Sequence, residues 1–207
     1  MMERFDYKKE YKDLYLPKAY PGEVEVPGIQ FIGAKGCGLP GSPEFSSAVN
    51  LLYSYTFSIK MSKMNGTQPK GYFEYVVPPL EAFFGTAQVR FRYEDKSTWT
   101  WTMAIRQPEF VELETFLETR EILRKKKPGI CVDDAQFFSF CEGRCAQVLH
   151  IGRYEDELLS LAKLDEYLSQ HGYAPAGRHH EIYLSDPRRT KPEKCKTVLR
   201  IPVKKVF

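Results

Sequence analysis

The sequence predicts an α+β fold of two pseudo-symmetric halves around a central ligand cleft, and three observations lead to this prediction. Strand-like runs alternate with segments of helical period along the 207 residues. The order hairpin, helix, strand, strand occurs twice. The stretches GYFEYVVPP (71–79) and GRHHEIYLSDP (177–187) each set a glutamate beside ring-bearing residues and before a proline. We expect one domain, made of an N-terminal arm (1–21), a first half (22–107), a linking helix (108–128) and a second half (129–207).

The first half is predicted to begin with a hairpin over residues 22–36, whose turn lies at Pro27 and Gly28. Ser42 and Pro43 suit the N-cap and the first position of an amphipathic helix. Two strands should follow this helix. One is GYFEYVV (71–77), which two prolines should end, and the other lies in STWTWTMAIRQP (97–108), where Thr and Trp alternate.

The linking helix is predicted to run from Pro108 to Lys127, because apolar residues recur at helical spacing and Pro128 ends the pattern. The second half then repeats the order of the first. Its predicted elements are a hairpin over 135–152 that turns at Glu142 and Gly143, a leucine-rich helix that Gly172 closes, and the strands HHEIYLS (179–185) and KTVLRIPV (196–203).

The composition is typical of a globular protein, and we expect it in the cytoplasm. The chain is 43% hydrophobic, yet no apolar run approaches the roughly 18 residues that span a bilayer. The five cysteines are an odd number and fit reduced thiols better than disulfides. They lack zinc-ligand spacing, so we expect no metal, and the absence of a phosphate loop or dinucleotide motif predicts no cofactor. The net charge of +3 is too weak to indicate a nucleic-acid partner.

Several long stretches of the chain carry a resemblance to a known family. They are KKEYKDLYLP near the N-terminus, YTFSIKMSKM and GYFEYVVPPLE in the first half, IRQPEF at the linking helix, and HIGRY and RHHEIYLSDPRRT in the second half. With them the sequence resembles the GyrI-like small-molecule-binding family, and within it a stand-alone branch. The same module forms the effector-binding domain of multidrug-responsive transcription activators. The resemblance extends from KKEYKDLYLP to the C-terminal IPVKK.

The resemblance implies a site as well as a fold. In the effector-binding domains a glutamate on a second-half strand meets cationic aromatic ligands, and the matching position here is Glu181. Members similar to the stand-alone branch are linked to hydrolysis of cyclopropane-bearing DNA-alkylating toxins. That branch often has paired tryptophans after PPLE, where this chain has Phe83 and Phe84, so its choice of ligand should differ.

Two glutamates are the candidate catalytic residues. A carboxylate that faces an aromatic pocket must meet a cation, accept hydrogen bonds or change its pKa. Glu181 fits this description, and the repeated element order puts Glu74 at the equivalent position. A purely structural alternative remains open for both. Arg178, Arg188 or His180 could pair with Glu181, and Lys63 or Lys70 could pair with Glu74.

Aromatic residues and one histidine are the candidate ligand-binding residues. Because strand neighbours point to opposite faces, Glu181 should share a face with Tyr183 and His179 but not with His180. His150 is either a structural histidine or a proton carrier at the lip of the cleft. The full set of expected ligand-binding residues is Trp99, Trp101, Tyr183, Tyr53, Phe83, Phe84, His150 and Tyr154.

Two functions fit these features. The first is a protein that binds, and as an enzyme hydrolyses, flat hydrophobic, cationic or electrophilic compounds. A carboxylate base and a tyrosine or histidine donor would supply the chemistry. The second is a module without catalysis, either an effector sensor or an inhibitor of another protein. Neither function involves a membrane, and the sequence does not identify a protein partner. A measurement of whether the protein turns over a toxin or only binds it stoichiometrically would separate the two functions.

Overall fold

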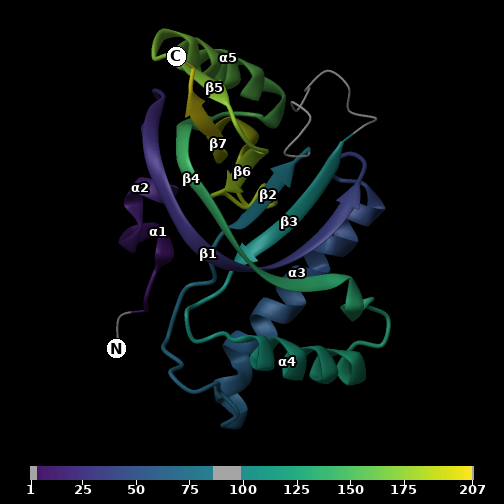
Figure 1. Cartoon of the computed structure of the whole chain (residues 1–207). Coiled ribbons are helices and arrows are strands. Elements are labelled where there is room, and N and C mark those ends of the chain that lie inside the picture. The colour runs from purple at the N-terminus through teal and green to yellow at the C-terminus, as the bar shows by residue number, and fades with distance from the viewer. Residues whose placement is uncertain (1–3, 86–98, 207) are drawn as a thin grey trace.

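The computed structural model describes residues 4–85 and 99–206 and shows an α+β fold, in which helices pack on one strongly curved sheet (Figure 1). The helices are α1 (Tyr7–Glu10), α2 (Lys12–Tyr15), α3 (Pro43–Met61), α4 (Leu113–Lys126) and α5 (Glu157–Gln170). The strands are β1 (Gly22–Cys37), β2 (Leu80–Phe84), β3 (Thr100–Arg106), β4 (Ala135–Ile151), β5 (Tyr173–Pro175), β6 (His179–Tyr183) and β7 (Lys196–Lys205). Short 3-10 turns are η1 (Ser62–Asn65), η3 (Val132–Asp134), η4 (Tyr154–Asp156) and η5 (Pro192–Lys194).

The sheet closes on itself as a barrel. Its strand order is β4-β1-β3-β2-β6-β7, and pairing of β4 with β7 completes the ring, while β5 pairs with the C-terminal end of β7, at residues 203–205. All pairs within the ring are antiparallel. Closure pairs the edges that an open sheet would leave exposed. It also gives every strand an inner face and an outer face.

The helices cover different parts of the outer face. α3 and α4 enclose a core against β1 and β3, with Leu52, Tyr55 and Met103 fully buried. α5 packs on β4 and β5, where Leu164 and Leu168 meet the sheet. In the strand order, β2 and β6 therefore lie between the part that α3 covers and the part that α5 covers. None of the helices in the described ranges is long and apolar enough to cross a membrane.

Both predicted amphipathic helices are confirmed. Ser42 caps α3, its hydroxyl accepting from the backbone N–H of Phe45 at 3.2 Å, and Pro43 is the first helical residue. In α5 the buried leucines lie four residues apart, and Gly172 follows the helix with φ of 65°. The described elements follow the order β1, α3, β2, β3 and then β4, α5, β6, β7, and the second series also contains the short strand β5 between α5 and β6. A pseudo-twofold relation between the halves remains a prediction.

The two predicted hairpins are wrong, because β1 and β4 are single long strands that pair with each other. Pro27 stands opposite Glu142, and the pairs Val26↔Gly143 and Gly28↔Cys141 continue on either side. Gly143 has φ of 67°, a value that glycine adopts without strain. The signals for a turn therefore lie inside two long paired strands, both of which curve around the barrel (Figure 1).

Two further elements differ from the prediction. Residues 71–77 form no strand, apart from an isolated bridge between Phe5 and Tyr75, and the strand β2 starts after the prolines instead of ending at them. A proline donates no ladder hydrogen bond, so it can precede a strand as well as stop one. α4 begins at Leu113, five residues after Pro108, because residues 109–112 form a turn and an extended segment.

The N-terminal arm is folded into the structure. Tyr7, Leu14 and Tyr15 of α1 and α2 are buried in the same core cluster as Phe83 and Ile182 of the barrel. Asp6 caps α1 through its side chain, which accepts from the N–H of Lys8. The arm therefore contributes aromatic side chains to the core that the sheet encloses.

Candidate functional site

Glu181 lies at the centre of β6, in a buried group of polar side chains. Only 4% of the residue is exposed. The Tyr183 hydroxyl donates to Glu181 Oε2 at 2.8 Å, and Nε2 of His179 lies 3.0 Å from Glu181 Oε1. These contacts confirm that the three residues share one face of the strand. A carboxylate only accepts hydrogen bonds, so an ionised Glu181 takes one from each of these neighbours.

Small and aromatic side chains lie beside Glu181 on the same face. Ala82, which has the smallest side chain of these neighbours, stands opposite Glu181 in the pairing of β2 with β6. One step along, Phe84 is opposite both His179 and Trp101, so three adjacent strands carry a row of rings. We call the side chains of His179, Glu181, Tyr183, Phe84 and Trp101 the Glu181 face.

The two tryptophans have different surroundings. Trp99 meets Phe84 edge to face, with ring centroids 5.3 Å apart. Trp101 is 2% exposed, donates from its indole N–H to the carbonyl of Gly38 at 3.1 Å and packs against Phe45 of α3. Trp99 is therefore the better candidate for a ligand wall, whereas Trp101 anchors α3 and β1 to the sheet.

Two tyrosines lie near this face, Tyr154 in η4 directly before α5 and Tyr53 in α3. Tyr154 of η4 meets the Tyr183 ring edge to face at 6.1 Å. Burial, with nearby acidic groups that include Glu181, raises the pKa of Tyr154 to about 12, so its hydroxyl stays protonated at neutral pH. Tyr53 of α3 packs against the same core as Tyr183, and burial followed by the charge of Asp186 raises its pKa as well. Both can donate a hydrogen bond to a ligand.

Three predicted site residues lie elsewhere. Phe83 points to the inner face, where it stacks on His180 with centroids 4.0 Å apart. His150 uses both ring nitrogens near Ser160 and the carbonyl of Arg153, each at 2.9 Å, and so joins β4 to α5. Glu74 forms an ion pair with Lys63, the structural alternative raised for it, and 28% of its side chain is exposed.

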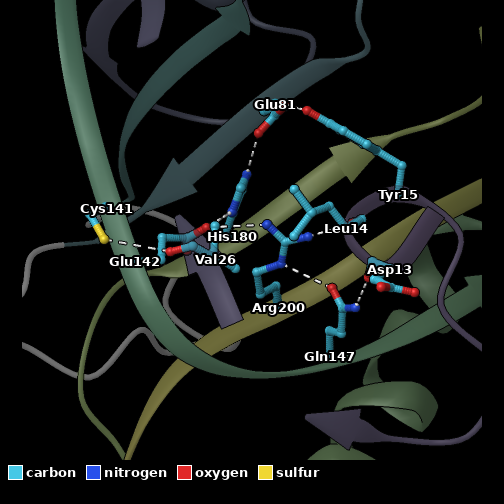
Figure 2. Close-up of polar contacts among 10 residues, drawn as sticks. All are labelled: Asp13, Leu14, Tyr15, Val26, Glu81, Cys141, Glu142, Gln147, His180 and Arg200. Carbon is cyan, nitrogen blue, oxygen red and sulfur yellow. Dashed lines mark hydrogen bonds and ion pairs between the residues drawn. The ribbon is translucent and has the colours of Figure 1, made fainter. Parts of the chain in front are cut away.

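Sequence reasoning missed a second group of buried charges on the inner face, which Figure 2 shows. We call Glu81, His180, Glu142 and Arg200 the inner cluster. His180 lies between the two carboxylates, and Arg200 lies beside Glu142. The available signal was the position of Arg200 and Glu81 between apolar neighbours, in VLRIPV and LEAFF. Among the described residues, no group of His, Cys, Asp and Glu side chains could hold a metal ion.

Comparison with known proteins places these features in a family. The family model for the GyrI-like small molecule binding domain matches residues 21–204. A search of curated proteins found no match. A structure of an uncharacterized conserved protein from Listeria innocua is 40% identical, with a TM-score of 0.92 over 97% of this chain and all of that one. A structure described as a hydrolase from Listeria innocua is 38% identical, with a TM-score of 0.87 over 97% of this chain and all of that one.

A more distant likeness supports the fold alone. The C-terminal domain of EcmrR is 14% identical and has a TM-score of 0.55, over 90% of this chain and 98% of that domain. The family match covers most of the chain, including the strands that carry Glu181 and its neighbours. The chain belongs to the GyrI-like small-molecule-binding family.

Proposed function

We propose that this protein binds flat hydrophobic or electrophilic xenobiotics next to Glu181 and hydrolyses those that carry a strained cyclopropane ring, such as DNA-alkylating toxins. The observation that carries the proposal is the buried Glu181 carboxylate, which Tyr183 and His179 contact and which aromatic rings flank. The similar Listeria innocua structure that is described as a hydrolase supports the enzymatic part. The family supports a small-molecule ligand.

The reaction adds one water molecule to the substrate. For a cyclopropane fused to a dienone, the water oxygen forms a bond to a ring carbon while a C–C bond of the ring breaks. The electron pair of that bond passes through the dienone to its carbonyl oxygen, which gains a proton and becomes a phenol hydroxyl. The attacking water loses one proton to a base and keeps the other in the new alcohol hydroxyl, so the product contains all the atoms of one water molecule. Nothing is oxidised or reduced, so the reaction needs no cofactor.

Glu181, Phe84 and two residues beside the Glu181 face, Tyr154 and Trp99, have suitable roles in this reaction. Glu181 orients the water and accepts its proton, because a carboxylate held by two donors is fixed in place. Tyr154 has a protonated hydroxyl at this side of the sheet and can donate to the dienone oxygen as its charge grows. Phe84 and Trp99 offer ring surfaces against which a flat substrate can stack.

Hydrolysis in isotopically labelled water tests the proposal. A cyclopropane-fused dienone is incubated with the protein in H₂¹⁸O, and mass spectrometry follows the product. We expect many turnovers per protein molecule, with one ¹⁸O atom in each product. The matched variant is Tyr154→Phe, which keeps the ring and removes the donor, and should slow turnover more than it weakens binding of the substrate.

The alternative is binding without turnover, as in an effector sensor or an inhibitor of another protein. The fold that the chain shares with the EcmrR C-terminal domain is the observation in its favour. In that case Glu181 acts as a counter-charge for cationic aromatic ligands. One bound molecule per protein, with the compound recovered unchanged, would establish this alternative and reject the enzymatic proposal.

A further inference from the structure

The strand β6 carries hydrogen-bonding side chains on both of its faces. His179, Glu181 and Tyr183 lie on the outer face, as described above. His180 and Ile182 lie on the inner face, and both are at most 1% exposed. His180 precedes Glu181 in the chain, so any force that moves the His180 backbone also moves the carboxylate on the other side.

Hydrogen bonding on the inner face favours a cationic His180. Its Nε2 lies 2.9 Å from Glu81 Oε2, and its Nδ1 lies 2.9 Å from Glu142 Oε2. An imidazolium carries a proton on each ring nitrogen and can donate to both carboxylates at once, whereas a neutral imidazole has one proton and can donate to only one of them. Burial alone would lower the pKa of His180, but the charges and hydrogen bonds of Glu142 and Glu81 outweigh burial and raise it. The geometry and the electrostatics agree on an imidazolium.

The inner cluster ties β6 to other parts of the barrel. Glu81 belongs to the neighbouring strand β2, Glu142 to β4 and Arg200 to β7. The bond from His180 to Glu142 therefore reaches past β7 to a strand that is not a neighbour of β6 in the ring. Arg200 also donates to Glu142 at 3.3 Å, so two cations balance two carboxylates.

The N-terminal arm closes this cluster. The Tyr15 hydroxyl approaches Glu81 Oε1 at 3.4 Å, and Arg200 donates to the backbone carbonyl of Leu14. Gln147 links the inner cluster to the N-terminal arm, because it accepts a hydrogen bond from Arg200 at 3.0 Å and donates one to the carbonyl of Asp13 at 2.6 Å (Figure 2). The titratable groups that contact His180 or its partners through hydrogen bonds are thus Glu81, Glu142, Arg200 and Tyr15, from β2, β4, β7 and α2. Arg178 and Cys145 also lie close enough to Glu142 to interact with its charge.

We propose that His180 is a positioning residue: as an imidazolium clamped between Glu81 and Glu142, it fixes β6 so that Glu181 points correctly into the ligand site on the opposite face. The claim that the orientation of Glu181 matters for ligand binding rests on the proposed function. The N-terminal arm takes part, since it supplies three of the contacts that hold the cluster. Loss of the charge on His180 should therefore change the Glu181 face without touching it.

The test compares variants of His180 with a matched variant on the same strand. His180→Gln removes the charge and leaves an amide of similar reach. His180→Gln combined with Glu81→Gln restores the balance of charge, because it removes one anion with the cation. Ile182→Ala is the control, since it removes buried packing from the inner face of β6 but no charge.

The first measurement is the carboxyl ¹³C signal of Glu181 in the ligand-free protein, assigned by its loss in Glu181→Gln. We expect His180→Gln to shift this signal, the double variant to return it toward the parent position, and Ile182→Ala to shift it less. An unmoved signal in His180→Gln, or an equal shift in the control, would overturn the proposal. Should His180→Gln fail to fold, Tyr15→Phe removes one donor to Glu81 and must still move the signal.

The second measurement is the affinity for ethidium, a planar aromatic cation, against phenanthridine, its neutral core. We expect His180→Gln to weaken ethidium binding about tenfold, within the usual range of coupling between two sites, and to leave phenanthridine binding nearly unchanged. If the parent protein binds neither compound, the proposed ligand class is wrong, yet the ¹³C signal still decides whether His180 positions Glu181. If binding responds only in Glu181→Gln, the proposed function stands and the role of His180 is rejected.

Discussion

Glu181 and Glu74 occur in similar stretches of sequence and have different surroundings in the structure. Glu181 is 4% exposed and holds hydrogen-bonding contacts with the residues two positions before and after it. The Glu74 side chain is 28% exposed and pairs with Lys63, eleven residues earlier. The difference arises because only one of them lies in a strand. In a strand, residues two apart share a face, whereas Glu74 lies in irregular chain where this rule does not apply.

The largest effect should come from removing the two charges in turn. We expect Glu181→Gln to slow hydrolysis of a cyclopropane-fused dienone by a factor on the order of 100 or more, because the base is lost while the shape is kept. Glu74→Gln should leave the rate unchanged. Steady-state rates of the two variants are the measurement. An equal loss of rate in both variants would mean that Glu74 and Glu181 have equivalent roles, as the sequence suggested.

Ring surfaces next to the two glutamates should differ in the same way. Trp99→Ala should weaken binding of a planar ligand by roughly 1 to 3 kcal/mol, because stacking and apolar burial are lost. Phe73→Ala, beside Glu74, is the control and should not affect binding. Titration calorimetry gives both values, and circular dichroism verifies the fold. Unchanged binding in Trp99→Ala would remove this ring from the site.

The pH dependence of stability should separate the two regions. His180, behind Glu181, has a raised pKa in the folded protein, so its stabilisation is complete below the unfolded value of about 6.5 and is lost as the pH rises through the folded value. Glu142 behaves oppositely. Burial alone would raise its pKa, but His180 and Arg200 lower it to about 2, so its stabilisation is lost only in strong acid.

Urea unfolding between pH 6 and 9 measures this effect. We expect stability to fall with pH by at most about 1.4 kcal/mol per unit, the slope for one proton. His180→Gln should flatten that slope, and Glu74→Gln should not, because the lowered pKa of Glu74 comes first from its hydrogen bond with Lys63 and matters only in acid. The same slope in the His180 variant would assign the pH dependence to another group.

The smallest effect should come from the Glu74 ion pair itself. Both partners are partly exposed, so water and salt screen their attraction and compete for their hydrogen bonds. We expect the melting temperature of Lys63→Met to match that of the parent within error at 0.15 M salt. A clear loss of stability would mean that this pair has a structural role comparable to that of the buried cluster.

Local pattern predicted the parts of the fold that depend on neighbouring residues. The cap at Ser42 and the leucine spacing of α5 are set within a few residues, and both are confirmed. The shared face of Glu181, Tyr183 and His179 followed from strand alternation in the same way. The family resemblance added the fold and the kind of ligand, which local pattern does not contain.

What the sequence did not reveal depends on contacts between distant segments. The turn signals at Pro27 and Gly143 mark bends in paired strands, and that pairing joins residues more than a hundred positions apart. The inner cluster gathers Glu81, His180 and Arg200 from three strands, and no local rule brings a glutamate, a histidine and an arginine to one point inside a barrel. The sequence also did not reveal which face of the sheet Phe83 occupies, because this depends on the pairing of β2, which starts at Leu80, with its neighbouring strands.

The hydrogen bond between Arg200 and the carbonyl of Leu14 joins residues 186 positions apart. During synthesis the arm leaves the ribosome first, but its partner in β7 emerges only after every other strand of the barrel. Until then Glu142 lacks its arginine, and the arm lacks one of its contacts with the barrel. Contacts of such separation slow folding, because a long loop must close before any energy is gained. A nascent chain that stops short of β7 would therefore expose apolar barrel surface together with uncompensated acidic groups, a form that chaperones and proteases recognise.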